Sequence, residues 1–234
     1  MNILHHIIEP SRLLMTWQPV DIDAPSRTRR VIGEIGLEPD GQIVFRYLIN
    51  TPDFEEACRA GFKGFPAFRL EDNEVRQGVI GSLLRRLPPR NREDFAEFLA
   101  QHRLPSPFNY SDMALLGYTG ARLPSDGFAL VPDFPENNMP CDYLMEVAGL
   151  RHVFGFDVSR IHEGDVVNFE IDHHNPVDQD ALLVILQGQK IGYVNRAFKA
   201  TLNRWLQSHH VMATIEKFNG RPERPLVYVM ISAD

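Results

Sequence analysis

The chain has 234 residues, a formal net charge of −7 and a sequence pI near 5.7. This length allows one large domain or two of ordinary size, and 44% hydrophobic with 24% charged residues is typical of a globular protein. The acidic balance excludes a protein that coats nucleic acid through its overall charge, but it leaves room for a small basic site.

The first part of the chain predicts an α+β domain over residues 1–132, with helices on a small antiparallel sheet. Its expected strands are 13–18, 30–37, 42–48 and 127–131. Its expected helices are 53–60, 73–87, 92–102 and 111–116. Asp40-Gly41 is a hairpin turn signal between the second and third strands. Thr51 can cap the first helix, with Pro52 at its first position, and Ser111 can cap the last.

Residues 133–140 are rich in Pro, Asn and Asp, which cannot continue a helix or a central strand. They predict a linker before a second domain at 141–234. That domain combines one expected helix, 196–207, with short strands. The strands are expected at 143–148, 165–171, 181–186, 190–194, 211–218 and 226–231. Many short strands with one helix favour a closed or half-closed, OB-like β-barrel.

Motifs that would mark an enzyme are absent from the sequence. There is no phosphate-binding P-loop, no Gly-x-Ser-x-Gly elbow and no His-Glu-x-x-His pair. We therefore expect no catalytic residue, no cofactor and no enzyme activity. Asp172, His173 and His174 are weak candidates for a divalent cation, but a polar turn is favoured and no metal is predicted. The pairs His5-His6 and His209-His210 are interpreted as ordinary polar positions.

A sharper signal comes from residues suited to a nucleotide. An apolar strand ends at Gly149, and it is followed by an arginine whose guanidinium can bind phosphate through two hydrogen bonds. A second arginine begins the helix at 196–207, where backbone N–H groups favour anions. A carboxylate, an amide and a ring on the same rim would hold a terminal nucleotide. The candidate binding residues are Arg151, His152, Asn175, Asp178, Tyr193 and Arg196. A salt-bridged barrel loop is an equally weighted alternative.

Three segments carry a more specific resemblance: 147–155, 175–182 and 190–196. In order over about 143–231, they resemble the HIRAN domain, a module found ahead of the motor of helicase-like ATPases. The resemblance implies an OB-like barrel that binds single-stranded DNA and holds its free 3′-hydroxyl end. Arg151 and His152 would then lie at the DNA end, Asp178 would accept a hydrogen bond from the terminal hydroxyl, and Arg196 would contact phosphate.

Two positions depart from that pattern. Val177 stands where the HIRAN family often has a stacking tyrosine, and His152 stands where an aromatic tyrosine is common. An imidazole can still stack on a base, whereas a valine cannot do so in the same way. The departures predict weaker or altered binding of a DNA 3′ end.

The first 135 residues resemble, more loosely, the N-terminal subdomain of the HipA toxin kinases, through segments 14–17, 31–35, 111–120 and 127–132. No kinase core follows, so this resemblance implies a non-catalytic docking domain. An alternative function is therefore an antitoxin-like module that binds a HipA-type kinase or another protein. Three phenylalanines in 61–68 would form an exposed patch for it, although core packing is favoured. A hydrolase is a third, disfavoured hypothesis, without ATP hydrolysis or zinc.

The two cysteines, Cys58 and Cys141, exclude a disulfide scaffold and a cysteine-built zinc module. Each is interpreted as a buried thiol of a reducing cytoplasm. The first residues lack a basic signal-peptide region, and no stretch approaches the roughly 20 apolar residues of a membrane span. We expect a cytoplasmic protein without a membrane partner.

Overall fold

The structure is a computed structural model that describes residues 2–21, 24, 27–150, 153, 160–175, 178–219 and 226–234. The chain divides into two compact units. We name Ile8–Pro135 the insert unit, and Met1–Ile7 together with Glu136–Asp234 the terminal unit. The division after Pro135 lies within the stretch expected as a linker. The first residues, up to Ile7, differ from the expected division because they pack with the second part of the chain.

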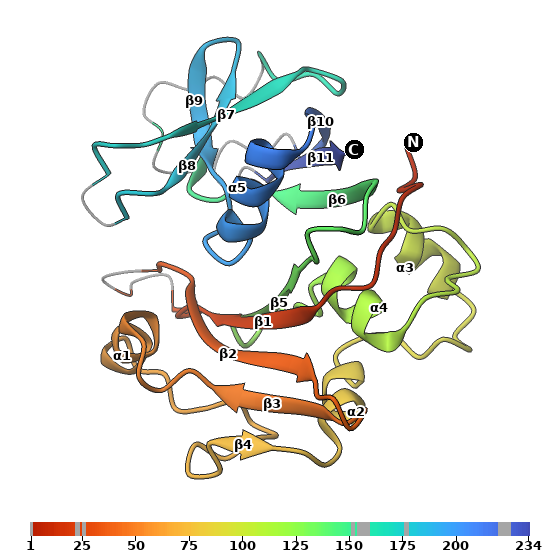
Figure 1. Ribbon diagram of the computed structural model, residues 1–234, viewed down its shortest axis with the longest axis vertical. Helices are drawn as coiled ribbons and strands as arrows, with labels where there is room; N and C mark the ends of the chain where they lie inside the picture. Colours follow the sequence, from red (N-terminus) through yellow and green to blue (C-terminus); the bar gives the residue numbers. More distant parts are fainter. Residues whose placement is uncertain are drawn as a thin grey trace. The chain divides into compact units, whose positions relative to one another are not determined.

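A five-stranded antiparallel sheet forms the centre of the insert unit, in the order β4-β3-β2-β1-β5 (Figure 1). Its strands are β1 (Arg12–Trp17), β2 (Arg30–Leu37), β3 (Ile43–Tyr47), β4 (Glu74–Val75) and β5 (Phe128–Asp133). The predicted hairpin joins β2 to β3. Gly41 has a φ of +81°, and the Asp40 carboxylate accepts the backbone N–H of Gln42 at 3.0 Å. The Asp-Gly signal is therefore confirmed as the turn.

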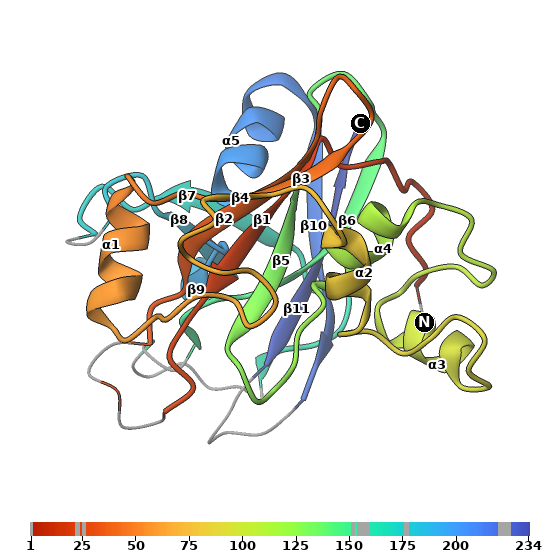
Figure 2. The same ribbon diagram turned by 90° about the horizontal axis from the view of Figure 1, so that it is seen from below.

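The described part of the insert unit has four short helices: α1 (Pro52–Arg59), α2 (Val79–Leu84), α3 (Phe95–Gln101) and α4 (Asp112–Thr119). The Thr51 hydroxyl caps α1 by accepting the N–H of Phe54 at 3.3 Å. The Ser111 hydroxyl caps α4 by accepting the N–H of Ala114 at 3.0 Å. Figure 2 shows α2 beside α4. Both expected caps are confirmed.

The core of the insert unit is rich in aromatic rings. Phe62, Phe65 and Phe68 are at most 5% exposed and pack with Phe45 in one cluster of buried apolar side chains. The Tyr47 hydroxyl fixes this loop, because it donates to the carbonyl of Phe68 at 2.7 Å and accepts the N–H of Phe65 at 2.8 Å. The exposed phenylalanine patch is therefore wrong, and the favoured core packing is confirmed.

The helix expected over 73–87 is also wrong in its first half. Glu74 belongs to β4, where its carboxylate accepts a hydrogen bond from the Arg46 guanidinium of β3 at 2.7 Å. Gly78 then has a φ of +67°, which an α-helix does not contain, and α2 begins only after it. The apolar spacing is real, but a cross-strand pair and one left-handed glycine divide the segment.

The described residues of the terminal unit form two antiparallel sheets and one helix (Figure 1). One sheet has the order β10-β11-β6 and the other β7-β8-β9. The elements are β6 (Cys141–Glu146), β7 (Val167–Ile171), β8 (Leu182–Leu186), β9 (Gln189–Tyr193), α5 (Lys199–Ser208), β10 (Val211–Phe218) and β11 (Val227–Ala233). The expected strands and helix are present, with ends that shift by a few residues.

The sequence predicts a closed or half-closed barrel, and the closed form is not found among the described residues. The two sheets meet at isolated bridges between Ala148 and Tyr193 and between Val166 and Thr214. Irregular register within the sheets, between Val184 and Ile185 and again after Ile215, interrupts the regular ladders. The terminal unit is therefore mostly β, with two linked sheets in place of one continuous barrel.

The helix α5 packs its buried face through aromatic contacts. The Phe198 ring lies 4.5 Å from that of Tyr143 on β6 and 5.5 Å from that of Trp205, measured between centroids. Phe198, Leu202 and Trp205 are almost completely buried. These contacts fix the start of α5, and so they also fix the charged residues that stand there.

Asp142 holds the N-terminal residues in the terminal unit. One of its carboxylate oxygens accepts the backbone N–H groups of His5 and His6, each at 2.9 Å, and the other accepts the Ser232 hydroxyl at 2.7 Å. The N–H of Asp142 donates to the carbonyl of His6 at 2.7 Å. His5 and His6, interpreted from the sequence as ordinary polar positions, therefore anchor the first residues through backbone hydrogen bonds to Asp142.

The cysteines differ from each other in exposure. Cys141 is buried as expected, whereas Cys58 is exposed on α1, so its expected burial is wrong. Cys58 follows the buried Ala57 and lies outside the face of α1 that packs on the core. Within the described part of the chain, no helix combines the length and apolar character that crossing a membrane requires.

Candidate nucleic-acid interface

The described part of the terminal unit includes four of the six predicted binding residues. Asn175 and Asp178 lie in the loop between β7 and β8, Tyr193 ends β9, and Arg196 precedes α5. The other two, Arg151 and His152, lie outside the described residues, as does Val177. The site is built below from the four described residues and the groups that contact them.

The loop between β7 and β8 is a succession of side-chain turns. Asp172 accepts the N–H of His174 at 3.3 Å, Asn175 accepts that of Asp178 at 3.0 Å, and Asp178 accepts that of Asp180 at 3.2 Å. This is the polar turn that the sequence favours. Among the described residues, no group of three or more His, Cys, Asp or Glu side chains is arranged to hold a metal.

Asp178 lies between two cations that come from the start of α5. The Lys199 ammonium is 2.7 Å from Oδ1 and 2.9 Å from Oδ2, and Arg196 Nη2 is 3.5 Å from Oδ2. The three side chains are 19–24% exposed, so solvent reaches them only in part. The structure therefore brings the predicted Asp178 and Arg196 together and adds Lys199 to them.

The electrostatics of this cluster favour a charged Asp178. Burial is the largest single influence and would raise its pKa, but the hydrogen bond and charge of Lys199 and the charge of Arg196 oppose it. The net result is a pKa below the ordinary value for aspartate. Asp178 is consequently an anion with two cationic neighbours at neutral pH.

Tyr193 belongs to a second polar group on the same sheet. Its hydroxyl donates to Asp172 Oδ2 at 2.8 Å and accepts from the Lys190 ammonium at 2.5 Å. That ammonium also lies 4.1 Å from the centroid of the tyrosine ring. The hydrogen bond from Tyr193 is the largest influence on Asp172 and lowers its pKa. The ring is therefore oriented by two charged neighbours.

A close backbone approach fixes Tyr193 against the chain that leads to Arg151. Tyr193 and Ala148 exchange two backbone hydrogen bonds, each of 2.8 Å. A Cβ at Gly192 would lie only 2.5 Å from the Ala148 carbonyl oxygen, so only glycine fits there. A Cβ at Gly149 would meet the Tyr193 ring at 3.3 Å. This contact joins the end of β9 to the residues that follow β6.

Lys199 and Lys190 are the site residues that the sequence reasoning missed. Lys199 stands three positions after Arg196, a spacing that brings two side chains to one side of a turn. That spacing was an available signal. Lys190 gave no comparable signal, because its contact with Tyr193 follows from the sheet register.

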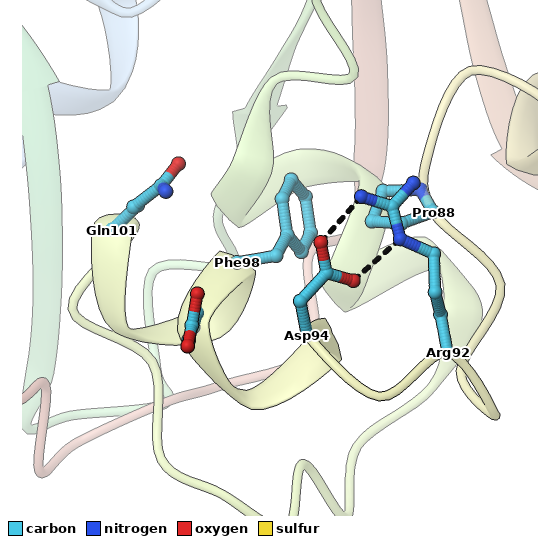
Figure 3. Close-up of a pocket in the computed structure, with 6 residues that line it drawn as sticks. Pro88, Arg92, Asp94, Phe98 and Gln101 are labelled. Carbon is cyan, nitrogen blue, oxygen red and sulfur yellow. Dashed lines mark hydrogen bonds and ion pairs between the residues drawn. The ribbon is translucent and has the colours of Figure 1, made fainter.

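A separate pocket lies in the insert unit, beside α3. Arg92 and Asp94 form an ion pair at one side of it, and Phe98 contributes its ring (Figure 3). Pro88, Glu97 and Gln101 complete the lining. None of the predicted binding residues is among these.

The terminal unit is thus a small β-rich module with charged groups gathered where a loop, a strand end and a helix start meet. Residues 142–225 match the family model of the HIRAN domain. This match confirms the predicted resemblance for the second part of the chain. The resemblance of the first part to HipA kinases, and its docking role, stay predictions.

Two solved structures are similar to part of the chain. The HIRAN domain of human HLTF has 16% identity and a TM-score of 0.31, covering 39% of this chain and 74% of that one. A structural-genomics target from Lactobacillus plantarum has 19% identity and a TM-score of 0.31, covering 41% and 95%. No match is found among the curated proteins.

Proposed function

We propose that the terminal unit binds single-stranded DNA at or near a strand end. The observation that carries this proposal is the HIRAN match over 142–225, because HIRAN domains are known for binding single strands and DNA 3′ ends. The described site residues from Asn175 to Lys199 fall inside that match. The chain would act by binding, without a chemical step of its own.

The chemistry of the site supports this proposal. Lys199 and Arg196 supply the cations that phosphate groups need, within one turn of chain. Tyr193 supplies an aromatic ring on which a base can stack, held in orientation by Asp172 and Lys190. Arg151, expected on the same rim, would add a third cation.

The overall charge limits how the DNA would bind. A formal net charge of −7 repels a polyanion at long range, so affinity must come from the few cations of this site. Each contact with a single-strand phosphate changes the slope of log K against log salt by about −0.7. We expect modest affinity, a shallow but measurable salt dependence, and little binding to a uniform duplex.

The direct test is fluorescence anisotropy of the full chain with labelled single strands at low salt. Binding of single strands, weakened by Arg151→Ala and by Arg196→Gln, is the expected result. Failure of single strands, of strands with a 3′-phosphate and of duplexes to bind would remove the proposal. Binding that both substitutions leave unchanged would show that the site is elsewhere on the chain.

The absence of enzyme activity is part of the same proposal. An ATPase assay with and without DNA is expected to give no turnover above background, because the sequence contains no P-loop. Turnover stimulated by DNA would contradict a purely binding role.

A further inference from the structure

The hydrogen bonds of Asp178 indicate which chemical group of a ligand this site can bind. A carboxylate has about four lone-pair positions. Oδ1 of Asp178 faces the Lys199 ammonium at 2.7 Å and the N–H of Asp180 at 3.2 Å. Oδ2 faces the same ammonium at 2.9 Å and the Arg196 guanidinium at 3.5 Å. Asp178 therefore accepts three hydrogen bonds and one ion-pair contact within the protein, so its carboxylate is largely engaged before any ligand arrives.

Lys199, in contrast, has more hydrogen-bond donors than Asp178 engages. An ammonium has three N–H donors, and the two oxygens of Asp178 engage two of them. The Lys199 side chain is 20% exposed, so the third donor can meet a group that arrives from solvent. The group best matched to this donor and to the neighbouring guanidinium is an anion with several acceptor oxygens.

From this arrangement we propose that the Lys199–Asp178–Arg196 cluster is a site for the phosphomonoester at the end of a nucleic-acid strand. The inference rests on the proposed function and specifies the group that this site selects. Lys199 and Arg196 contact the phosphate, and Asp178 is a positioning residue that holds the two cations together. On this proposal Asp178 holds the cations, whereas the HIRAN resemblance implies that it accepts a hydrogen bond from a terminal hydroxyl.

A terminal phosphate fits this cluster better than an internal one. A phosphodiester carries one negative charge, whereas a phosphomonoester carries between about 1.5 and 2 at neutral pH and presents three acceptor oxygens. Two cations that share a single carboxylate gain most from the group with the larger charge. The phosphate can stand at the 3′ or the 5′ end, and the two ends are separate arms of the test.

The experiment is anisotropy of the full chain with three internally labelled single strands of one sequence. One strand has hydroxyls at both ends, the second has a 3′-phosphate and the third a 5′-phosphate. We expect one of the phosphorylated strands to bind about tenfold more tightly than the unphosphorylated strand, the usual scale of a charge-assisted contact. Free inorganic phosphate should compete with that strand.

Four variants sharpen the result. Lys199→Gln should remove most of the phosphate preference, and Lys199→Arg should keep most of it because the charge is retained. Asp178→Asn should keep the preference, because the amide oxygen can still accept a hydrogen bond from Lys199 while a negative charge beside the phosphate is removed. Lys217→Gln is the matched control. Lys217 belongs to β10 and lies 4.4 Å from the centroid of the Tyr228 ring, and it is not one of the three residues of the cluster, so its loss should leave the preference intact.

The outcomes separate the two proposals. Equal affinity for all three strands would overturn the phosphate site and leave single-strand binding standing. An Asp178→Asn variant that loses the unphosphorylated strand selectively would also overturn it, because the carboxylate would then read a hydroxyl. No binding of any strand would overturn both proposals. Thermal melting of each variant shows whether a loss of binding reflects a loss of fold.

Discussion

Two charged clusters, one on the β1 strand of the insert unit and one in the terminal unit, have opposite ratios of positive to negative groups. On the insert sheet an arginine lies between carboxylates: Arg12 contacts Asp133 at 2.9 Å and Glu34 at 2.7 Å. In the terminal unit a carboxylate lies between cations, because Asp178 contacts both Lys199 and Arg196. The first arrangement has negative charge to spare and repels phosphate, whereas the second attracts it.

Arg46 repeats the pattern of the insert unit. It contacts Glu38 and Glu74, each at 2.7 Å, and the hydrogen bond to Glu38 is the largest of the influences that raise its pKa. Arg46 and Glu74 are direct partners in the register of β3 and β4. Cross-strand pairs of this kind stabilise a sheet surface. The comparison therefore separates charges that stabilise a sheet from charges that can accept a ligand.

The largest expected effect comes from breaking a buried pair of the insert unit. Arg86 binds Asp126 through two hydrogen bonds of 2.6 and 2.9 Å and donates to the carbonyl of Ala121 at 2.7 Å. Its side chain is 7% exposed. Arg86→Ala should lower the free energy of unfolding by about 4 kcal/mol, because Asp126 loses its partner in a partly buried place.

Urea unfolding measures this loss through Trp17, the tryptophan of the insert unit, in a Trp205→Phe background. Arg86→Lys is the control, because it keeps the charge and loses the paired geometry, so its effect should be smaller. A variant Arg86→Ala that is as stable as its parent would contradict a structural role for this pair.

A slightly smaller effect is expected at the buried carboxylate of the terminal unit. Asp142 accepts four hydrogen bonds or polar contacts, from the backbone of His5 and His6, from Ser232 and from the His6 ring. Asp142→Ala should cost about 3 kcal/mol, because several donors lose their acceptor. Trp205 fluorescence in a Trp17→Phe background reports the change.

Ser232→Ala is the control for Asp142. It removes the single hydrogen bond to Oδ1 and should cost about 1 kcal/mol. If the two substitutions cost the same, the backbone bonds of His5 and His6 contribute nothing to the stability of the terminal unit.

Acid should weaken the terminal unit through the same carboxylate. Burial, the largest influence, would raise the pKa of Asp142, but the hydrogen bonds from Ser232 and from the backbone of His6 and His5 lower it overall. A lowered pKa means that the stabilisation is complete above the ordinary aspartate pKa of about 3.9 and is lost as the pH falls through the folded value. The stability difference between the parent and Asp142→Asn should therefore shrink in acid, as measured by urea unfolding at several pH values. A stability difference that does not change with pH would contradict the interpretation that Asp142 stabilises the fold as a charged carboxylate.

The smallest effect is expected on the exposed charges of the insert sheet. The Arg12 side chain is 47% exposed, so Arg12→Gln should cost less than about 1 kcal/mol, and added salt should reduce that cost. It should leave DNA affinity unchanged in the anisotropy assay. A loss of affinity would show that the insert unit contributes to DNA binding. It would contradict the distinction between sheet-stabilising charges and ligand-binding charges.

Signals that depend on neighbouring residues predicted the fold well. The Asp40-Gly41 turn and the caps at Thr51 and Ser111 each involve contacts within three residues, so the sequence contains the whole interaction. The helix expected at 73–87 is wrong in its first half because Glu74 pairs with Arg46, which lies 28 residues away. Local apolar spacing carries no information about such a partner.

The candidate site divides in the same way. Asp178 and Arg196 were predicted from motifs, and their mutual contact is present. Lys199 was missed because its partner is 21 residues away and is reached only when α5 packs on Tyr143. His5 and His6 were interpreted as ordinary because their anchor, Asp142, is more than 130 residues away along the chain.

The chain passes from the terminal unit into the insert unit after Ile7 and returns after Pro135, which has a consequence for protein engineering. The ends of the insert unit are neighbours, since Ser11 donates to the carbonyl of Asp133 at 2.9 Å across β1 and β5. In the terminal unit, His6 and Asp142 are equally close, joined by a 2.7 Å hydrogen bond. Residues 8–135 therefore form a cassette whose excision leaves two adjacent ends for a short loop to join, while a fragment that starts at 136 lacks the segment that Asp142 binds.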